Sequence, residues 1–342
     1  MTRKMPAAVF EGEGRLVVRE VPVPEVRASD DVLLAVRAAG ICGTDVHILA
    51  VPPEHPASPG IVLGHEYVAD VLACGDGVEH VRPHDRVVVD PSVWCGSCAY
   101  CQRGLTNLCD RMSGIGIVRD GGFAPFSVVP ARAVYRISAD VPTEVAALAE
   151  PLADVLNGAR KASILPGETV LVLGAGPIGL LFTLLFRAAG AAQVLVAEVA
   201  SYRARHARAC GADVIINPRE EDLPAAVRVR TGLGADIVVD AVGTLLEDAL
   251  RCVRKGGRVV LFGMHEQARP VVKQYDVTKY ELQILGTYIA RGTFPLATQL
   301  LESGRVDFPR LVTHRLPLRD IAQGIELLRH GEAVKVAVIP EH

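Results

Sequence analysis

The segment VLVLGAGPIG, residues 170–179, constrains the fold of this 342-residue chain more than any other. A short apolar run of β-strand type leads into Gly174, Gly176 and Gly179, and an apolar stretch of helical length follows. The first glycine permits a tight turn, the second lets a pyrophosphate approach the backbone, and the third lets helix and strand pack closely. Amides at the start of such a helix bind phosphate. The segment therefore predicts a dinucleotide-binding strand–turn–helix unit, although ordinary strand–turn–helix packing is the alternative.

After this turn, apolar runs of strand length alternate with stretches of helical spacing. The runs are QVLVAE, DVIINP, ADIVVDAVG, GGRVVLFG and LQILGTY. Strands that are apolar throughout and separated by helices indicate a parallel sheet with right-handed crossovers and helices on both faces. We therefore expect an α/β fold with a Rossmann-type, doubly wound parallel sheet.

The second predicted strand ends at Glu198, 24 residues after Gly174. A carboxylate at this place accepts hydrogen bonds from the ribose hydroxyls of adenosine and repels a 2′-phosphate, so it favours NAD over NADP. Arg203 lies close enough in sequence to keep NADP as an alternative. The residues expected at the cofactor are Gly174, Gly176, Pro177, Ile178, Gly179, Glu198, Arg203 and Val242.

About the first 150 residues contain short β-type runs broken by Gly, Pro and Asp, such as DDVLLAVRAAG and DRVVVDP. This pattern predicts a compact, barrel-like β domain. The end of the chain has mixed character, with a helix expected near 295–303 and a last strand in KVAVIP. We expect a first domain at 1–152, the dinucleotide domain at 153–288, and a tail at 289–342 that returns to the first domain.

Composition excludes some partners and locations. The chain has 36 Lys and Arg against 39 Asp and Glu, a formal net charge of −3, and no long basic run, so we expect no nucleic-acid partner. Thr169–Phe186 is apolar, but glycines and Pro177 interrupt it and Arg187 ends it, which argues against a membrane span. The start of the sequence lacks the apolar core of a secretory signal, which predicts a cytoplasmic protein. In that reducing compartment, clustered thiols indicate metal binding rather than disulfides.

Half of the eight cysteines lie in WCGSCAYCQRGLTNLC, residues 94–109. Four thiolates on one looping segment can close a tetrahedron around zinc and leave no position for substrate, so a lobe at about 91–112 is expected to be structural. The spacing matches neither common ferredoxin pattern, which argues against an iron–sulfur cluster. The expected ligands are Cys95, Cys98, Cys101 and Cys109.

A second candidate set combines Cys42 in CGTDVH, His65 and Glu66 in GHEYV, and Glu150 in ALAEPL. One cysteine, one histidine and one carboxylate would leave a fourth zinc position open for water or substrate, as catalysis requires. Each residue alone is weak evidence, because a single buried cysteine and a solvated His-Glu pair are common in proteins.

In this order and spacing, CGTDVH, GHEYVADV, the four-cysteine lobe and VLVLGAGPIG resemble the zinc-dependent medium-chain alcohol dehydrogenase superfamily over essentially the whole chain. The resemblance implies a GroES-like β-barrel catalytic domain beside the Rossmann domain, two zinc ions per chain, and a homodimer or homotetramer. CGTDVH and GHEYV look like threonine dehydrogenases. ALAEPL and LVTHRLPL, residues 311–318, look like sorbitol and other polyol dehydrogenases.

The resemblance also implies roles at the metal. Cys42, His65 and Glu150 match the catalytic-zinc ligands, with Glu150 binding directly or through water. Glu66 matches a carboxylate that can exchange on and off the metal. Asp45 matches the acceptor that orients the zinc-bound histidine, because a partner of this kind fixes the imidazole ring.

Two further roles concern protons and phosphate. Thr44 and His47 match a proton relay that would run from the substrate hydroxyl through Thr44 and the nicotinamide ribose to His47. Hydrogen bonding within the loop is the alternative for both residues. Lys335 matches a residue that can reach the cofactor pyrophosphate.

These implications lead to an NAD-dependent zinc dehydrogenase that oxidises a secondary alcohol of a polyol, sugar or cyclitol to a ketone. Dehydrogenases of threonine or of a butanediol-type diol are the nearest rivals. The segment TYIARGTFP, residues 287–295, and Ile48 depart from the sorbitol enzymes and argue against sorbitol itself. A non-catalytic dinucleotide-binding redox sensor is the remaining alternative, but it need not keep Cys42, Thr44, His47, His65, Glu66 and Glu150 together.

Overall fold

The computed structural model describes residues 3–341, and the chain divides into two units. The first unit contains the chain up to Ala153, Ala290–Arg305 and the chain from Val312 onward. The second unit contains Asp154–Ile289 and Val306–Leu311, so it is inserted between segments of the first.

A six-stranded parallel sheet with the order β12-β11-β10-β13-β14-β15 forms the second unit. The order reverses between β10 and β13, which is the switch point at which doubly wound sheets bind their ligands. The predicted Rossmann-type sheet is confirmed. Its strands are β10 (Thr169–Leu173), β11 (Gln193–Ala197), β12 (Val214–Ile216), β13 (Ala235–Asp240), β14 (Val253–Leu261) and β15 (Gln283–Gly286).

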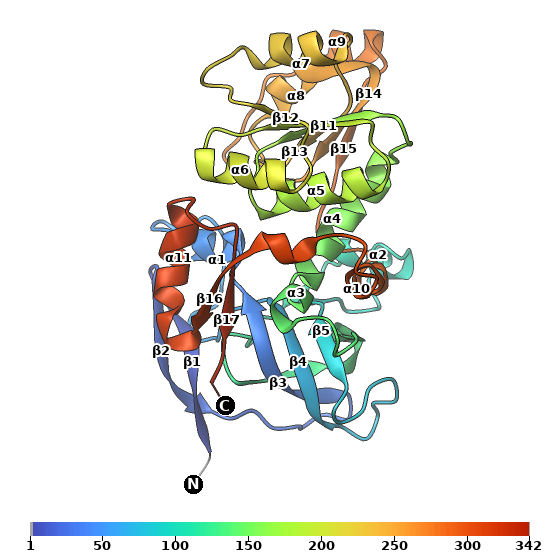
Figure 1. Ribbon diagram of the computed structural model, residues 1–342. Coiled ribbons are helices and arrows are strands. Elements are labelled where there is room, and N and C mark those ends of the chain that lie inside the picture. Colours follow the sequence, from blue (N-terminus) through green and yellow to red (C-terminus); the bar gives the residue numbers. More distant parts are fainter. Residues whose placement is uncertain (1–2, 342) are drawn as a thin grey trace. The chain divides into compact units, whose positions relative to one another are not determined.

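Helices cover both faces of this sheet. Figure 1 shows α5 (Pro177–Ala188) and α6 (Ser201–Ala209) on one face, and α7 (Leu223–Thr231) and α8 (Leu246–Cys252) on the other. The short helix α9 (Gln274–Lys279) precedes β15. Because both faces are covered, β10 and β11 are almost fully buried and consist of Val, Leu and Ala beyond their first residue.

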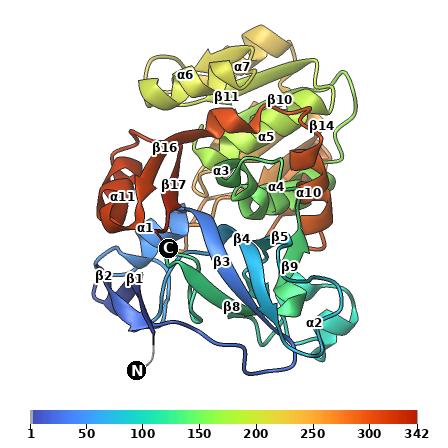
Figure 2. The same ribbon diagram turned by 60° about the horizontal axis from the view of Figure 1, so that its bottom comes forward.

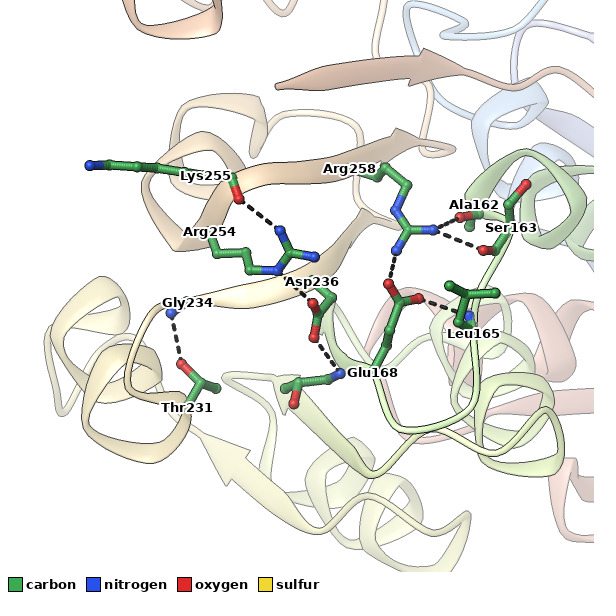
Figure 3. A network of polar contacts seen from close by, with 11 residues as sticks. Ala162, Ser163, Leu165, Glu168, Thr231, Gly234, Asp236, Arg254, Lys255 and Arg258 are labelled. Carbon is green, nitrogen blue, oxygen red and sulfur yellow. Dashed lines mark hydrogen bonds and ion pairs between the residues drawn. The ribbon is translucent and has the colours of Figure 1, made fainter. Parts of the chain in front are cut away.

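Ion pairs tie the strands of the second unit together at the end opposite the glycine turn (Figure 3). Arg258 of β14 pairs with Glu168, which precedes β10, and donates to the carbonyl of Ala162 at 2.6 Å. Arg254 of β14 pairs with Asp236 of β13 at 2.5 Å, and Asp236 accepts the amide N–H that opens β10 at 2.7 Å. The glycine turn therefore lies at the carboxyl end of β10, and these ion pairs hold the strands together at the opposite end.

The first unit is built on a mostly antiparallel seven-stranded sheet with the order β16-β17-β3-β4-β5-β9, in which β8 also pairs with β3. Figure 2 shows β3, β4 and β8 running side by side. Two antiparallel pairs, β1-β2 and β6-β7, complete the strands. Their bounds are β1 (Lys4–Gly12), β2 (Arg15–Pro22), β3 (Asp31–Gly40), β4 (Glu66–Cys74), β5 (Arg86–Val89), β6 (Ser92–Val93), β7 (Ser113–Gly114), β8 (Phe126–Pro130), β9 (Val134–Arg136), β16 (Val312–Pro317) and β17 (Lys335–Ile339).

Short helices connect these strands. They are α1 (Gly43–Ile48), α2 (Ala99–Gln102), η1 (Thr106–Leu108), η2 (Ala131–Ala133), α3 (Thr143–Ala146), α10 (Phe294–Glu302), η4 (Leu318–Asp320) and α11 (Ile321–Arg329). The longer helix α4 (Ala149–Ala162) begins in the first unit and continues into the second. The core of the first unit joins β1, β3, β4 and α11 through residues such as Val9, Leu34, Tyr67 and Ile325.

The sequence suggested that the whole tail, 289–342, returns to the first unit. Part of it belongs to the second unit instead. Val306–Leu311 belongs to the second unit. The helix η3 (Phe308–Leu311) buries Phe308 and Leu311, and Arg310 donates to the carbonyl of Ala209 in α6 at 3.0 Å. The rest of the tail pairs with the first unit, because β17 runs antiparallel to β3.

Among the described residues, every helix is too short or too polar to cross a lipid bilayer. The apolar helix α5 contains 12 residues, which is well below the length that a membrane span requires.

Candidate active site and metal centres

Strand pairing brings three predicted metal ligands together. In the antiparallel β3–β4 pair, Gly40 lies opposite Glu66. Cys42 follows the end of β3 and His65 precedes β4, so the same pairing places both beside Glu66. One ligand atom from each of Cys42, His65 and Glu66 lies within 4.8 Å of the other two.

The turn after β3 is held by a capping box at the start of α1. The amide of Cys42 donates to Oδ2 of Asp45 at 2.9 Å, and the amide of Thr44 donates to Sγ of Cys42 at 3.5 Å. The other oxygen of Asp45, Oδ1, is 3.6 Å from Nδ1 of His65. That separation is too long for a hydrogen bond, and neither atom has another hydrogen-bond partner among the described residues. Asp45 thus faces His65, and its role in orienting a metal-bound ring stays a prediction.

Burial and excess negative charge dominate the electrostatics of this group. Burial raises the pKa of the Cys42 thiol, and the neighbouring Glu66 carboxylate raises it further. Burial alone would lower the pKa of His65, but the carboxylates of Asp45, Glu150 and Glu66 outweigh it and raise the value. A dication would neutralise such a group, because it stabilises the thiolate and the carboxylates together.

Two carboxylates compete for a place at the metal. Glu150, in the first turn of α4, is buried and close enough to affect the pKa of His65, but it lies outside the group of atoms within 4.8 Å. Glu66 belongs to that group, yet its Oε2 is 2.5 Å from Nζ of the buried Lys335. Lys335 also donates to the carbonyl of Ile41 at 3.3 Å. Lys335 therefore pairs with a candidate metal ligand, whereas the resemblance had placed it at the cofactor.

These side chains fit a zinc ion. The set combines a thiol, an imidazole and carboxylates, which are the ligands of catalytic zinc, and binding through only one of the carboxylates would leave an open position. The orphaned Nδ1 of His65 beside Asp45 also fits a ring whose other nitrogen is held by a metal.

The two relay candidates lie on α1. Thr44 and His47 are three residues apart, so they lie on one face of the helix. Nδ1 of His47 is 2.5 Å from Oε2 of Glu54, and the amide of Glu54 donates to the carbonyl of His47 at 3.0 Å. No sequence pattern pointed to Glu54, because its contact with His47 depends on how the following loop folds back.

The four cysteines of the lobe converge, and their sulfurs all lie within 4.8 Å of one another. The separations Cys95–Cys101 and Cys98–Cys109 are both 4.0 Å. A tetrahedral zinc with Zn–S bonds of about 2.3 Å requires sulfurs about 3.8 Å apart, so the lobe fits the ion closely. The amide of Ser97 is the largest of several hydrogen-bond donors that lower the pKa of Cys95 to about 5.

The three glycines after β10 have the geometry that a dinucleotide turn needs. Gly174 has φ +92°, which only glycine adopts without strain. A Cβ on Gly176 would meet no atom within 4 Å, which leaves space for a ligand, and a Cβ on Gly179 would lie 1.9 Å from the carbonyl oxygen of Gly174. Gly176 caps α5 with extended backbone, and Pro177 and Ile178 form its first turn.

Glu198 follows β11 and lies against this turn. Its carboxylate accepts the amide N–H of Ala175 at 2.8 Å and that of Ala200 at 2.7 Å. Glu198 also lines a cavity of about 610 Å³ together with Ser201, Arg205 and Arg208. The two amides fix the carboxylate and leave further lone pairs on both oxygens for ligand hydroxyls.

Arg203 and Val242 have different surroundings. Nε of Arg203 is buried and has no hydrogen-bond partner among the described residues. Val242 follows β13 and approaches Gly174, where its Cγ2 would lie 2.7 Å from an added Cβ. The loop after β13 is organised by the buried Asp240, which accepts the amides of Val242, Gly243 and Leu245 at 2.8–2.9 Å. Asp240 was not among the residues expected at this site, although its position at the carboxyl end of a parallel strand is a usable signal.

Two family models match most of the chain. Residues 28–139 match the family model described as the alcohol dehydrogenase GroES-like domain. Residues 177–303 match the model described as zinc-binding dehydrogenase.

Individual relatives cover almost the whole chain. The chain is 37% identical over 324 residues to D-altritol 5-dehydrogenase of Agrobacterium fabrum, covering 93% of this chain and 94% of the relative. It is 36% identical over 333 residues to L-threonine 3-dehydrogenase of Anaeromyxobacter sp. (strain K), covering 95% of each. The structure of a zinc-binding dehydrogenase from Sinorhizobium meliloti 1021, solved with NADP, superposes on this chain with a TM-score of 0.94. The two sequences are 35% identical, and the match covers 99% of this chain and 100% of that one.

Proposed function

Because the chain belongs to the zinc-binding dehydrogenase family with an alcohol dehydrogenase GroES-like domain, we propose that it oxidises a secondary alcohol of a polyol, sugar or cyclitol to a ketone. The single observation that carries this proposal is the buried donor group of Cys42, His65 and Glu66, with Glu150 close by. A group with open coordination suits the binding of a substrate oxygen. The similarity to an altritol dehydrogenase supports a polyol in particular.

Threonine is the second candidate substrate. CGTDVH and GHEYV resemble threonine dehydrogenases, and L-threonine 3-dehydrogenase of Anaeromyxobacter is 36% identical over nearly the same length. Both substrates carry a secondary hydroxyl beside a second polar group. The reaction class is therefore common to both, and only the substrate skeleton differs.

We assign the zinc to Cys42, His65 and Glu150. Glu66 is a poorer resident ligand, because the buried ammonium of Lys335 already neutralises it. When bound, zinc would lower the pKa of a coordinated hydroxyl and the nicotinamide would accept hydride. Asp45 faces the ring of His65. Thr44 would accept a hydrogen bond from the substrate hydroxyl and give up its own proton toward His47 as it takes up the substrate's, and His47 would release a proton to solvent.

We propose NAD as the preferred cofactor. The fixed carboxylate of Glu198 can accept both ribose hydroxyls, and it opposes the charge of a 2′-phosphate. Arg205 and Arg208 in the same cavity partly offset that charge, so the preference should be finite.

Replacing Glu198 tests this preference. We expect Glu198→Ala to lower the ratio of kcat/KM for NAD to that for NADP by about ten-fold or more, because a charge-assisted hydrogen bond is lost and a repulsion is removed. The matched control is Glu220→Ala, which removes another carboxylate from the same cavity. Equal ratios in both variants would show that Glu198 does not set the preference.

The function itself is tested by a screen of NAD and NADP reduction with hexitols, pentitols, inositols, threonine and short diols. We expect turnover with a polyol, and none in Cys42→Ser. Turnover with threonine alone would select the second candidate. The absence of turnover with every secondary alcohol, in protein that retains its zinc, would refute the enzymatic proposal.

A further inference from the structure

One guanidinium of the four-cysteine lobe lies against the sulfurs. Nη2 of Arg111 is 3.4 Å from Sγ of Cys95 and 2.6 Å from Oγ of Ser97. The amide N–H of Arg111 donates to Sγ of Cys109 at 3.3 Å. Arg111 therefore contacts two of the four sulfurs, one through its side chain and one through its backbone.

The contact between the Arg111 guanidinium and Cys95 places a positive charge beside a negatively charged zinc site. Four thiolates around one zinc dication leave two excess negative charges. Neutral amides donate to the sulfurs, among them the amide of Cys98 to Cys95 at 3.4 Å and that of Cys101 to Cys98 at 3.5 Å. A cationic donor withdraws more charge from sulfur than a neutral amide does, because charge-assisted hydrogen bonds are about twice as strong.

Cys95 and Cys98 differ in the donors that contact their sulfurs. Both residues are half-buried, so burial of the residue does not distinguish them. Cys95 has the Arg111 guanidinium beside it, and the hydroxyl of Ser97 donates to it at 3.8 Å. A thiolate that accepts more hydrogen bonds is a weaker nucleophile, so Cys98 should react first.

We propose that Arg111 is a positioning residue of the structural zinc site that protects Cys95 from electrophiles and thereby slows loss of the metal. Ser97 holds the guanidinium over the sulfur through its Oγ. This role concerns the stability of the lobe and does not depend on which alcohol the protein oxidises.

The test follows zinc release from the full-length protein treated with iodoacetamide, using a chromophoric zinc chelator at fixed pH. Each alkylation forms one S–C bond, releases one iodide and removes the charge of one thiolate. We expect Arg111→Ala to release its lobe zinc about ten-fold faster, since contacts around metal ligands commonly change metal affinity by 10- to 100-fold. Peptide mass spectrometry should show that labelling of Cys95 rises relative to Cys98.

Two further variants separate this role from a general loosening of the lobe. Arg103→Ala removes the same charge from the same lobe. Because the Arg103 side chain makes no hydrogen bond or ion pair within the described residues, this variant should release zinc at the wild-type rate. Arg111→Lys keeps the charge and should recover most of the protection. All variants keep the backbone donor of residue 111.

Three outcomes would overturn the proposal. The first is equal zinc release from Arg111→Ala and Arg103→Ala. The second is faster release with an unchanged ratio of Cys95 to Cys98 labelling, which would indicate loosening of the whole lobe. The third is a wild-type protein whose four lobe cysteines react at once and which holds no zinc there.

Discussion

The buried pair of Lys335 and Glu66 sets the charge of the candidate catalytic metal site. Lys335 is 2% exposed and Glu66 is 1% exposed, so removing the ammonium leaves a carboxylate with no water to solvate it. We expect Lys335→Met to lower the free energy of unfolding of the metal-free protein by about 3 kcal/mol. Zinc should restore most of this loss, because the freed carboxylate can then bind the dication. Urea unfolding with and without zinc measures both effects.

A double-mutant cycle provides the control for this prediction. Glu66→Gln together with Lys335→Met removes both charges, and it should be more stable without metal than Lys335→Met alone. If Glu66→Gln changes the stability equally in the wild type and in Lys335→Met, then Lys335 and Glu66 are not coupled in the folded protein.

A second prediction concerns the pH dependence of stability at Asp90. Burial raises the pKa of this carboxyl from 3.8 to about 6, although the amide of Ser92 donates to it at 2.9 Å. Between about pH 4 and pH 6 the unfolded chain loses this proton and the folded chain retains it, so stability falls as the pH rises. Above pH 6 the full penalty is present.

Asp90→Asn should therefore stabilise the protein more at pH 8 than at pH 5, by about 1 kcal/mol. The measurement is urea unfolding of both proteins at the two pH values. Asp76→Asn, at an exposed position, makes the same change of charge and should show no such difference. The same pH dependence in both variants would contradict the assignment to Asp90.

At the scale of secondary-structure elements, the loop between β7 and β8, residues 115–125, packs against the segment that carries His65. A Cβ on Gly121 would lie 2.1 Å from the carbonyl oxygen of Gly64 and 2.5 Å from Cα of Gly116. The amide of Gly121 also donates to the carbonyl of Val62 at 2.8 Å. Because backbone atoms cannot move aside cheaply, a side chain there must displace the loop that ends in His65.

We expect Gly121→Ala to cost about 1–3 kcal/mol of stability, as overpacking does, and to lower the zinc occupancy of the site at His65. The zinc of the four-cysteine lobe should remain. Gly286→Ala is the matched control, because a Cβ there meets no atom within 4 Å. Metal analysis and thermal unfolding test the prediction, and full zinc occupancy in Gly121→Ala would disprove it.

For the whole protein, the two metal sites should differ in how they lose zinc. A zinc ion held by Cys42, His65 and one carboxylate would keep an open position through which a chelator can attack, whereas four cysteines would close the site around the ion. We expect about two zinc ions per chain, and a chelator should first remove one of them and abolish activity while the circular dichroism stays unchanged. Loss of both ions at the same rate would argue against an open and a closed site.

Homo-oligomerisation stays a prediction, which sedimentation velocity can decide.

Features governed by local spacing could be predicted from the residues alone. The alternation of apolar strands and helices led to the parallel sheet, because a helix between two strands returns the chain in the same direction through a right-handed crossover. The glycines at 174, 176 and 179 and the four lobe cysteines lie within short segments, so backbone geometry alone limits where they can lie. The residues suggested the donor set Cys42, His65, Glu66 and Glu150 only weakly, and the family resemblance was needed to support it, since these residues are scattered along the chain.

The contacts that needed the tertiary structure join distant segments. Lys335 and Glu66 are 269 residues apart, and they meet because β17 pairs with β3 and β3 pairs with β4. The association of Val306–Leu311 with the second unit and the approach of Glu54 to His47 have the same origin. Short-range spacing carries no information about such meetings, because they depend on which strands pair and how the loops between them close.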